Sequence, residues 1–123
     1  MTDDIFLFDT YALLEILNKN PKYEEYTNKD IIINEFIFAE FCYKLFLENI
    51  KEAKEYIDEL TLAIIRPDNK IIEKAMQFRV QNKNKKMSMT DCISYIMAKE
   101  LKIKFLTGDK EFESLENVEF VKK

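Results

Sequence analysis

The chain has 123 residues, of which 47% are hydrophobic and 34% are charged, with one glycine, two prolines and a formal net charge of −4. This length and composition are typical of a single folded domain over residues 1–123, and they exclude a disordered or fibrous chain. There is no histidine, which excludes Ser-His-Asp and Cys-His nucleophile systems and nearly every zinc site, so any catalytic chemistry must be carried by carboxylates.

The N-terminus lacks the basic start and cleavage site of a signal peptide. No apolar run approaches the roughly 18 residues that a membrane-spanning helix needs. We therefore expect a soluble, cytoplasmic protein with no membrane partner. The two cysteines, Cys42 and Cys92, stand within apolar helical patterns, where cysteine usually behaves as a small buried hydrophobe.

The first predicted element is a short apolar strand at residues 5–8, IFLF, which suits the centre of a parallel sheet. Asp9 follows it, and an amphipathic helix begins at Thr10. Asp9 thus lies just past the carboxyl end of a strand, where parallel α/β sheets bind ligands. Aspartate is also a favoured N-cap, so the sequence leaves a purely structural role for Asp9 open.

A second apolar run at residues 31–33 ends at Asn34, a favourable cap for the helix that follows. That helix, EFIFAEFCYKLFLEN, is apolar on most of its circumference, which predicts that it is buried. Glu40 is the exception in this stretch. It either forms a surface pair with Lys44 one turn on, worth a few tenths of a kcal/mol, or faces water or a cation.

The middle of the chain predicts a charged helix over residues 50–60, an extended piece at 62–65 and a helix from Asp68 to about residue 81. At the end of the helix that begins at Asp68, and in the loop after it, there is a basic block with no acid between its members: Arg79, Lys83, Lys85 and Lys86. The block is consistent with a phosphate-binding patch or with a solvated loop.

The charge is distributed unevenly along the chain. Residues 1–60 contain 6 basic and 14 acidic residues, a net of −8, whereas residues 61–123 contain 13 basic and 9 acidic residues, a net of +4. A polyanionic partner is therefore easier to accommodate on the second half of the chain than the overall charge suggests.

Residues 88–109, SMTDCISYIMAKELKIKFLTGD, predict a helix, a short turn and a strand. Ser88 and Asp91 have the spacing of a capping box, so the helix should begin near Ser88. The run IKFLT at 103–107 is a short β-type segment closed by Gly108, and Asp109 lies just beyond it. A short helix near residues 112–115 and a last strand at 118–121 complete the chain. No glycine precedes position 108, which excludes glycine-rich phosphate and dinucleotide loops.

Strands that alternate with helices predict an α/β fold, a three-layer α/β/α sandwich around a mostly parallel sheet. Asp9, Glu40, Asp91 and Asp109 then all belong to elements that start or end at the carboxyl edge of that sheet, and we expect them to meet in one acidic pocket. Repulsion among converging carboxylates is normally relieved by a hard cation such as Mg²⁺ or Mn²⁺. Such ions can activate water against a phosphodiester without histidine.

Three stretches, FDTYALLEIL, INEFIFAEF and MTDCISYIMAKELKIKFLTGDKEF, together resemble the PIN domain family in its small VapC-type toxin form. The resemblance covers nearly the whole chain. Asp9-Thr10 matches the opening aspartate and small hydroxyl residue of the family. Glu40 matches the family's glutamate in the helix after the second strand. Asp91 matches the aspartate that opens the helix before the family's fourth strand. Thr107-Gly108-Asp109 matches the T-x-D motif at the end of that strand.

The resemblance implies a metal-dependent endoribonuclease that is usually dimeric and often held inactive by an antitoxin. We expect hydrolysis of single-stranded RNA with Mg²⁺ or Mn²⁺, with Asp9 and Asp91 as the principal ligands, Asp109 completing the site and Glu40 positioning the attacking water. Thr10 and Thr107 would support these acids. The basic block would contact RNA phosphates, and surplus apolar surface on the helix over residues 35–49 would cover a homodimer or antitoxin interface.

Two departures from the family pattern concern substrate and partner more than activity. Cys92, Ser94 and Tyr95 stand where the family commonly has alanines, and the acidic balance is not typical of every RNA binder. A haloacid-dehalogenase phosphatase would need an aspartate two residues after Asp9, where Tyr11 stands, and a receiver domain would need its acidic pair after the first strand. The remaining alternative is a PIN-like module that binds RNA or protein without cleaving it.

Overall fold

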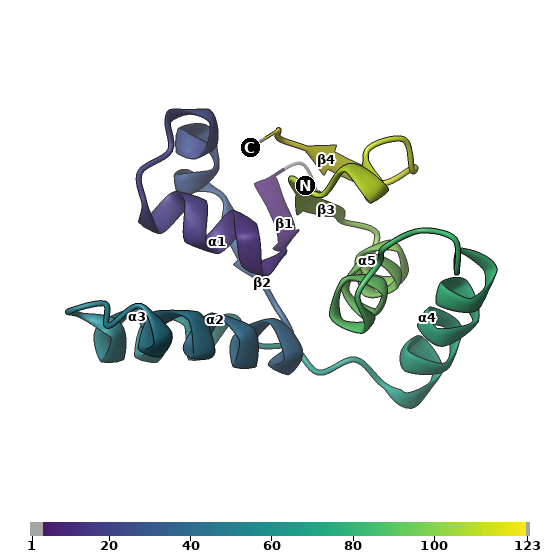
Figure 1. Cartoon of the computed structure of the whole chain (residues 1–123), viewed down its shortest axis with the longest axis horizontal. Helices are drawn as coiled ribbons and strands as arrows, with labels where there is room; N and C mark the ends of the chain where they lie inside the picture. Colours follow the sequence, from purple (N-terminus) through teal and green to yellow (C-terminus); the bar gives the residue numbers. More distant parts are fainter. Residues whose placement is uncertain (1–3, 123) are drawn as a thin grey trace.

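The computed structural model describes residues 4–122 and contains a four-stranded parallel sheet in the order β2-β1-β3-β4 (Figure 1). The strands are β1 (Ile5–Phe8), β2 (Asp30–Ile32), β3 (Lys104–Thr107) and β4 (Val118–Phe120). Leu7 stands opposite Ile32 on one side and opposite Phe105 on the other, so β1 and β3 form the centre of the sheet. The predicted α/β fold with a parallel sheet is confirmed.

The helices connect these strands in the predicted order. The α-helices are α1 (Thr10–Leu17), α2 (Glu35–Leu47), α3 (Ala53–Leu60), α4 (Asn69–Gln81) and α5 (Met89–Leu101). Three 3₁₀ helices lie between them or after them, namely η2 (Pro21–Asn28), η3 (Thr61–Ala63) and η4 (Lys110–Phe112).

The strand order determines where the helices lie. The chain moves outward from β1 to β2 through α1, and later returns past β1 to β3 through α5. Crossovers between parallel strands are right-handed as a rule, and two such crossovers that run in opposite directions along the sheet place α1 and α5 on opposite faces. Figure 1 shows α1 and α5 on either side of β1. The reversal between β1 and β3 opens a crevice at their carboxyl ends, the usual ligand position in such sheets.

Four helices begin at the caps that the sequence predicts. Asp9 Oδ1 accepts from the Ala12 N–H at 2.7 Å, and Asp68 Oδ1 accepts from the Ile71 N–H at 2.9 Å. The Asn34 side chain receives the N–H groups of Phe36 and Ile37, and the Ser88 hydroxyl receives that of Asp91. Each cap satisfies donors that a helix start leaves unpaired.

The second long helix, which its apolar circumference predicts to be buried, is buried on one side only. Ile37, Phe41 and Leu45 of α2 are buried, but Tyr43, Phe46 and Leu47 are 63%, 61% and 57% exposed. One stripe of α2 packs against the core, and the opposite stripe is more than half exposed. Hydrophobic periodicity could not reveal this, because both stripes are apolar.

The segment at residues 62–65 also differs from the expected extended piece. It begins with η3, and extended pairing is limited to one bridge between Ile33 and Ile64. The helix predicted from residue 50 begins at Ala53, and the predicted helix near residue 112 is the single turn η4. Cys92 is buried as expected, whereas Cys42 is only half-buried.

The core lies on both faces of β1 and β3. Leu7, Phe8, Phe105 and Leu106 are fully buried, with Phe112 of η4 packed edge-on against Phe105. Burial of these strands on both faces is the reason that they read as continuous apolar runs. Within residues 4–122, no helix is both long and apolar enough to cross a membrane.

Candidate active site

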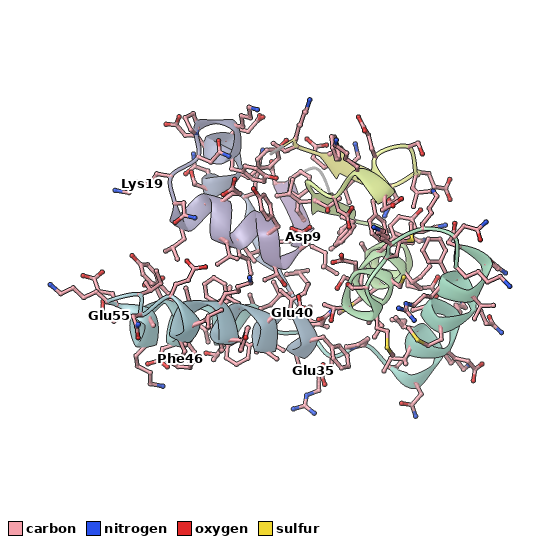
Figure 2. All side chains as sticks on the ribbon, in the orientation of Figure 1. Asp9, Lys19, Glu35, Glu40, Phe46 and Glu55 are labelled. Atoms are coloured by element: carbon pink, nitrogen blue, oxygen red, sulfur yellow. The ribbon has the colours of Figure 1, made fainter. Side chains whose placement is uncertain are left out.

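All four predicted acids line one cavity of about 210 Å³ at the carboxyl ends of β1 and β3. The residues around this acidic cavity are Asp9, Thr10, Tyr11, Glu40, Ser88, Asp91 and Asp109. Figure 2 shows Glu40 on the side of α2 that faces Asp9, with Phe46 on the opposite side of the helix. Side chains from α1, α2, α5 and the end of β3 therefore meet at one place.

Asp9 is the most buried acid of the cavity, with 3% of its surface exposed. Its Oδ1 caps α1, and its Oδ2 accepts a 2.6 Å hydrogen bond from the hydroxyl of the fully buried Thr107. Capping and a position in the cavity are thus compatible roles. Each carboxylate oxygen has a further lone pair, so Asp9 can accept these bonds and still act as a ligand.

Thr107 also fixes the segment that carries Asp109. Its Oγ1 accepts from the Asp109 N–H at 3.0 Å, and Asp109 Oδ1 in turn accepts from the Glu111 N–H at 3.0 Å. One hydroxyl therefore joins the acid after β1 to the turn after β3. This explains the T-x-D spacing, because the threonine at the strand end must reach both neighbours.

Glu40 belongs to the cavity and not to a surface pair. Its Oε1 accepts a 2.6 Å hydrogen bond from the hydroxyl of Thr10, the first residue of α1. No ion pair joins Glu40 to Lys44 among the residues that the structure describes. The Thr10–Glu40 bond connects α1 to α2 across the mouth of the cavity.

Asp91 lies in the first turn of α5, three residues after the Ser88 cap. Its pKa is raised from 3.8 to about 7, mainly by burial and then by the negative charges of Asp9, Asp109 and Glu40, against a hydrogen bond with Ser88 that lowers the pKa. A carboxyl in this environment resists ionisation unless a positive charge approaches.

The donor set suits a hard divalent cation, because it consists of carboxylate and hydroxyl oxygens around a site of concentrated negative charge. In residues 4–122, no three acids already lie close enough together to hold one ion directly. Mg²⁺ usually keeps several waters and binds through one or two carboxylates, so the spacing is compatible with a hydrated ion.

Two further residues line the acidic cavity, Tyr11 and Ser88, and the sequence does not predict either of them there. The sequence pattern indicates only a place on a helix for Tyr11 and a helix cap for Ser88. The Tyr11 hydroxyl donates to Glu15 Oε1 at 2.8 Å. Burial, together with that bond, raises the pKa of Tyr11 to about 12, so its phenol stays protonated at neutral pH.

A buried polar contact braces the two helices that carry Glu40 and Asp91. Asn34 Nδ2 donates to Ser94 Oγ at 3.0 Å, and the Ser94 hydroxyl donates to the Thr90 carbonyl at 2.7 Å. Both Asn34 and Ser94 are fully buried. Serine at position 94, where alanine would be the common family residue, is therefore explained by its partner at the start of α2.

The four residues of the basic block have different surroundings. The Arg79 guanidinium donates through Nε to the Met87 carbonyl at 3.1 Å and so braces the loop before α5. Lys86 lines a second cavity next to the acidic one, whereas Lys83 and Lys85 line neither. Contact of these four residues with RNA stays a prediction.

Comparisons with known proteins identify a family and a shared fold. The family model of the PIN domain matches residues 6–118. No curated protein matches the sequence.

Three solved structures share the fold at low sequence identity. A toxin–antitoxin complex from Klebsiella pneumoniae has a TM-score of 0.80 at 17% identity, over 95% of this chain and 98% of that chain. The Mycobacterium tuberculosis toxin VapC20, which cleaves the sarcin-ricin loop, has a TM-score of 0.79 at 16% identity, with 95% and 98% covered. VapBC2 from Rickettsia felis, bound to a DNA fragment from its promoter, has a TM-score of 0.70 at 19% identity, with 94% and 96% covered.

Proposed function

The chain belongs to the PIN domain family, and from this premise we propose that it is a divalent-metal-dependent endoribonuclease that hydrolyses single-stranded RNA. One observation carries the proposal, namely the position of Asp9, Glu40, Asp91 and Asp109 around a single cavity at the crevice between β1 and β3. Four acids without a basic residue among the cavity-lining residues are suited to a cation and unsuited to an anion on its own.

Asp9 and Asp91 are the principal metal ligands in this proposal. Asp9 is suited to the role because Thr107 and the Ala12 N–H hold its carboxylate in one orientation. Asp91 is suited because the repulsion that raises its pKa would be relieved by a bound cation. Asp109 completes or orients the site from the turn after β3. When bound, Mg²⁺ or Mn²⁺ supplies the positive charge that activates water and stabilises the leaving oxygen.

Glu40 is assigned to position the attacking water. Thr10 holds Oε1, so Oε2 is the oxygen that would accept a hydrogen bond, and then a proton, from that water. With no histidine in the chain, a carboxylate is the group available in the cavity for this task. Removing the Thr10 hydroxyl should therefore impair catalysis through Glu40.

We further propose that the protein is the toxin of a toxin–antitoxin pair and forms a homodimer. Support comes from the structural neighbours of K. pneumoniae and R. felis, and from the exposed apolar stripe of α2 formed by Tyr43, Phe46 and Leu47. Expression in a bacterial host should arrest growth, and the Asp9→Asn variant should not. Equal arrest by both would contradict toxicity through RNA cleavage.

A second candidate is a PIN-like module that binds RNA or protein without cleaving it. It is favoured by the absence, in the described part of the chain, of three acids close enough to hold one ion directly. The two candidates differ in their requirement for a metal.

The decisive experiment is cleavage of single-stranded RNA by the purified protein with Mg²⁺ or Mn²⁺ and with EDTA. Asp9→Asn keeps the cap on α1 but removes the charge, and we expect at least about a 100-fold loss of rate. Asp68→Asn is the matched control, because Asp68 caps α4 in the same way at an exposed position. If Asp9→Asn cleaves like wild type, or if cleavage persists in EDTA, the metal-dependent mechanism at the acidic cavity is wrong. If the wild type cleaves no RNA with either metal, the binding-module candidate replaces the nuclease.

A further inference from the structure

A second cavity, of about 370 Å³, adjoins the acidic cavity and shares Asp109 with it. Its lining residues are Lys86, Gly108, Asp109, Lys110, Glu111 and Lys122. The three lysines come from three separate segments: the loop before α5, the start of η4 and the residues after β4. We call this feature the lysine cavity.

The three lysines are exposed, and none of them forms an ion pair with another residue between positions 4 and 122. The two acids of the lysine cavity are instead engaged with backbone amides. Asp109 Oδ1 accepts from the Glu111 N–H at 3.0 Å, and Glu111 Oε1 accepts from the Lys86 N–H at 3.3 Å. The ammonium groups are therefore available to an anion that enters from solvent.

The lysine cavity places basic charge on one side of the acidic cavity. The other residues around the acidic cavity, such as Thr10, Tyr11 and Glu40, are neutral or acidic. A polyanion that approaches the four acids is repelled from that side, and the lysines on the side of β3, η4 and the residues after β4 supply compensating charge. This side belongs to residues 61–123, the half of the chain with a net charge of +4 (Figure 1).

We propose that Lys86, Lys110 and Lys122 form a subsite for the RNA phosphate next to the scissile one. The inference rests on the proposed function and adds the path of the substrate. Asp109 is the shared wall, so a phosphodiester over the acids would place its neighbouring phosphate over the lysines. Of the predicted basic block, only Lys86 belongs to the proposed subsite. The other two members, Lys110 and Lys122, are distant from that block in the sequence.

The test measures binding of a short fluorescein-labelled single-stranded RNA by fluorescence anisotropy, in CaCl₂ and over a series of NaCl concentrations. The variants are Lys86→Gln, Lys110→Gln, Lys122→Gln and their triple combination. We expect each single variant to weaken binding about three- to tenfold. The triple variant should flatten the slope of log affinity against log salt by about 0.7, since the subsite neutralises one phosphate and each neutralised phosphate of a single strand contributes about that much.

Two controls make this test specific to the lysine cavity. Lys70→Gln removes an exposed lysine of the basic half outside both cavities, and it should bind like wild type. Lys83→Gln removes a member of the basic block that is absent from the lysine cavity. If Lys83→Gln weakens binding as much as the triple variant, or if the triple variant binds like wild type, the inference is overturned.

Cleavage assays separate this inference from the proposed function. With an active enzyme, the triple variant should lower kcat/KM mainly by raising KM, whereas Asp9→Asn should abolish turnover. If the triple variant cleaves RNA with the same KM as wild type, the subsite is refuted but the nuclease proposal is not. If wild type cuts no RNA with Mn²⁺ while the triple variant still loses RNA binding and salt dependence, the nuclease proposal fails and the lysine cavity is an RNA-phosphate site without cleavage beside it.

Discussion

Replacing Asp91 by asparagine should stabilise the metal-free protein at neutral and alkaline pH. The Asp91 carboxyl is partly buried and faces three other acids, so its ionised form is disfavoured in the folded protein. Its pKa is raised from 3.8 to about 7. In the unfolded chain the group ionises near the lower value, so the folded protein loses stability as pH rises from about 4 to about 7. Asparagine carries no charge and avoids this loss.

The size of the effect follows from the pKa. Each pKa unit corresponds to about 1.4 kcal/mol, so a rise from 3.8 to about 7 sets an upper limit of roughly 4 kcal/mol. Water reaches the partly exposed carboxyl and screens the repulsion, so we expect roughly 1–2 kcal/mol above about pH 7. For a domain of this size, that corresponds to a melting temperature about 3–8 °C higher.

The assay is thermal unfolding in EDTA at about pH 5 and about pH 8, where the gain from Asp91→Asn should grow with pH. Glu55→Gln is the matched control, because Glu55 occupies the corresponding first-turn position of α3 and is exposed. Glu55→Gln measures the loss of a favourable helix-dipole interaction alone, which lowers the free energy of unfolding by about 0.3–1 kcal/mol. If Asp91→Asn destabilises the protein as much as Glu55→Gln at both pH values, the repulsion argued for the acidic cavity is absent.

Three other substitutions test separate contacts. Thr107→Val removes the hydroxyl that holds Asp9 and the Asp109 amide, and we expect RNA cleavage to slow roughly 10- to 100-fold; an unchanged rate would show that this hydroxyl does not position the acids. Ser94→Ala leaves the buried Asn34 amide nitrogen with only a 3.7 Å contact to Met97 Sδ, so urea unfolding should show a loss of about 1–3 kcal/mol, and a change near zero would contradict the bracing role. Phe46→Glu places a charge on the exposed stripe of α2 and should shift a dimer toward monomer in analytical ultracentrifugation, whereas a wild type that stays monomeric at high micromolar concentration would contradict self-association through this stripe.

Much of the fold could be predicted because local signals and tertiary structure agree. Asp9, Asn34, Asp68 and Ser88 each cap the helix that the sequence places after them, and the apolar runs at residues 5–8 and 103–107 contain the central strands β1 and β3. Parallel pairing then brings the ends of β1 and β3 together. For this reason the meeting of Asp9 and Asp109 could be anticipated from the order of elements alone.

Other features depend on how the helices rotate against each other, which local patterns do not encode. Glu40 could have paired with Lys44, and the choice is made by the Thr10 hydroxyl on another helix. The apolar circumference of α2 gave no indication of which stripe would stay exposed. Lys86, Lys110 and Lys122 are likewise brought together by tertiary structure, because β3 and β4 pair and the loop before α5 folds toward η4.

The central claim, that the four acids hold a divalent cation, is tested most directly by Mn²⁺ binding to the purified protein, measured by electron paramagnetic resonance near neutral pH. Wild type and Asp68→Asn should bind Mn²⁺, and Asp9→Asn and Asp91→Asn should lose most of that binding because each removes a charge from the cavity. Equal Mn²⁺ binding by wild type and both cavity variants, or no binding by wild type, would contradict the claim.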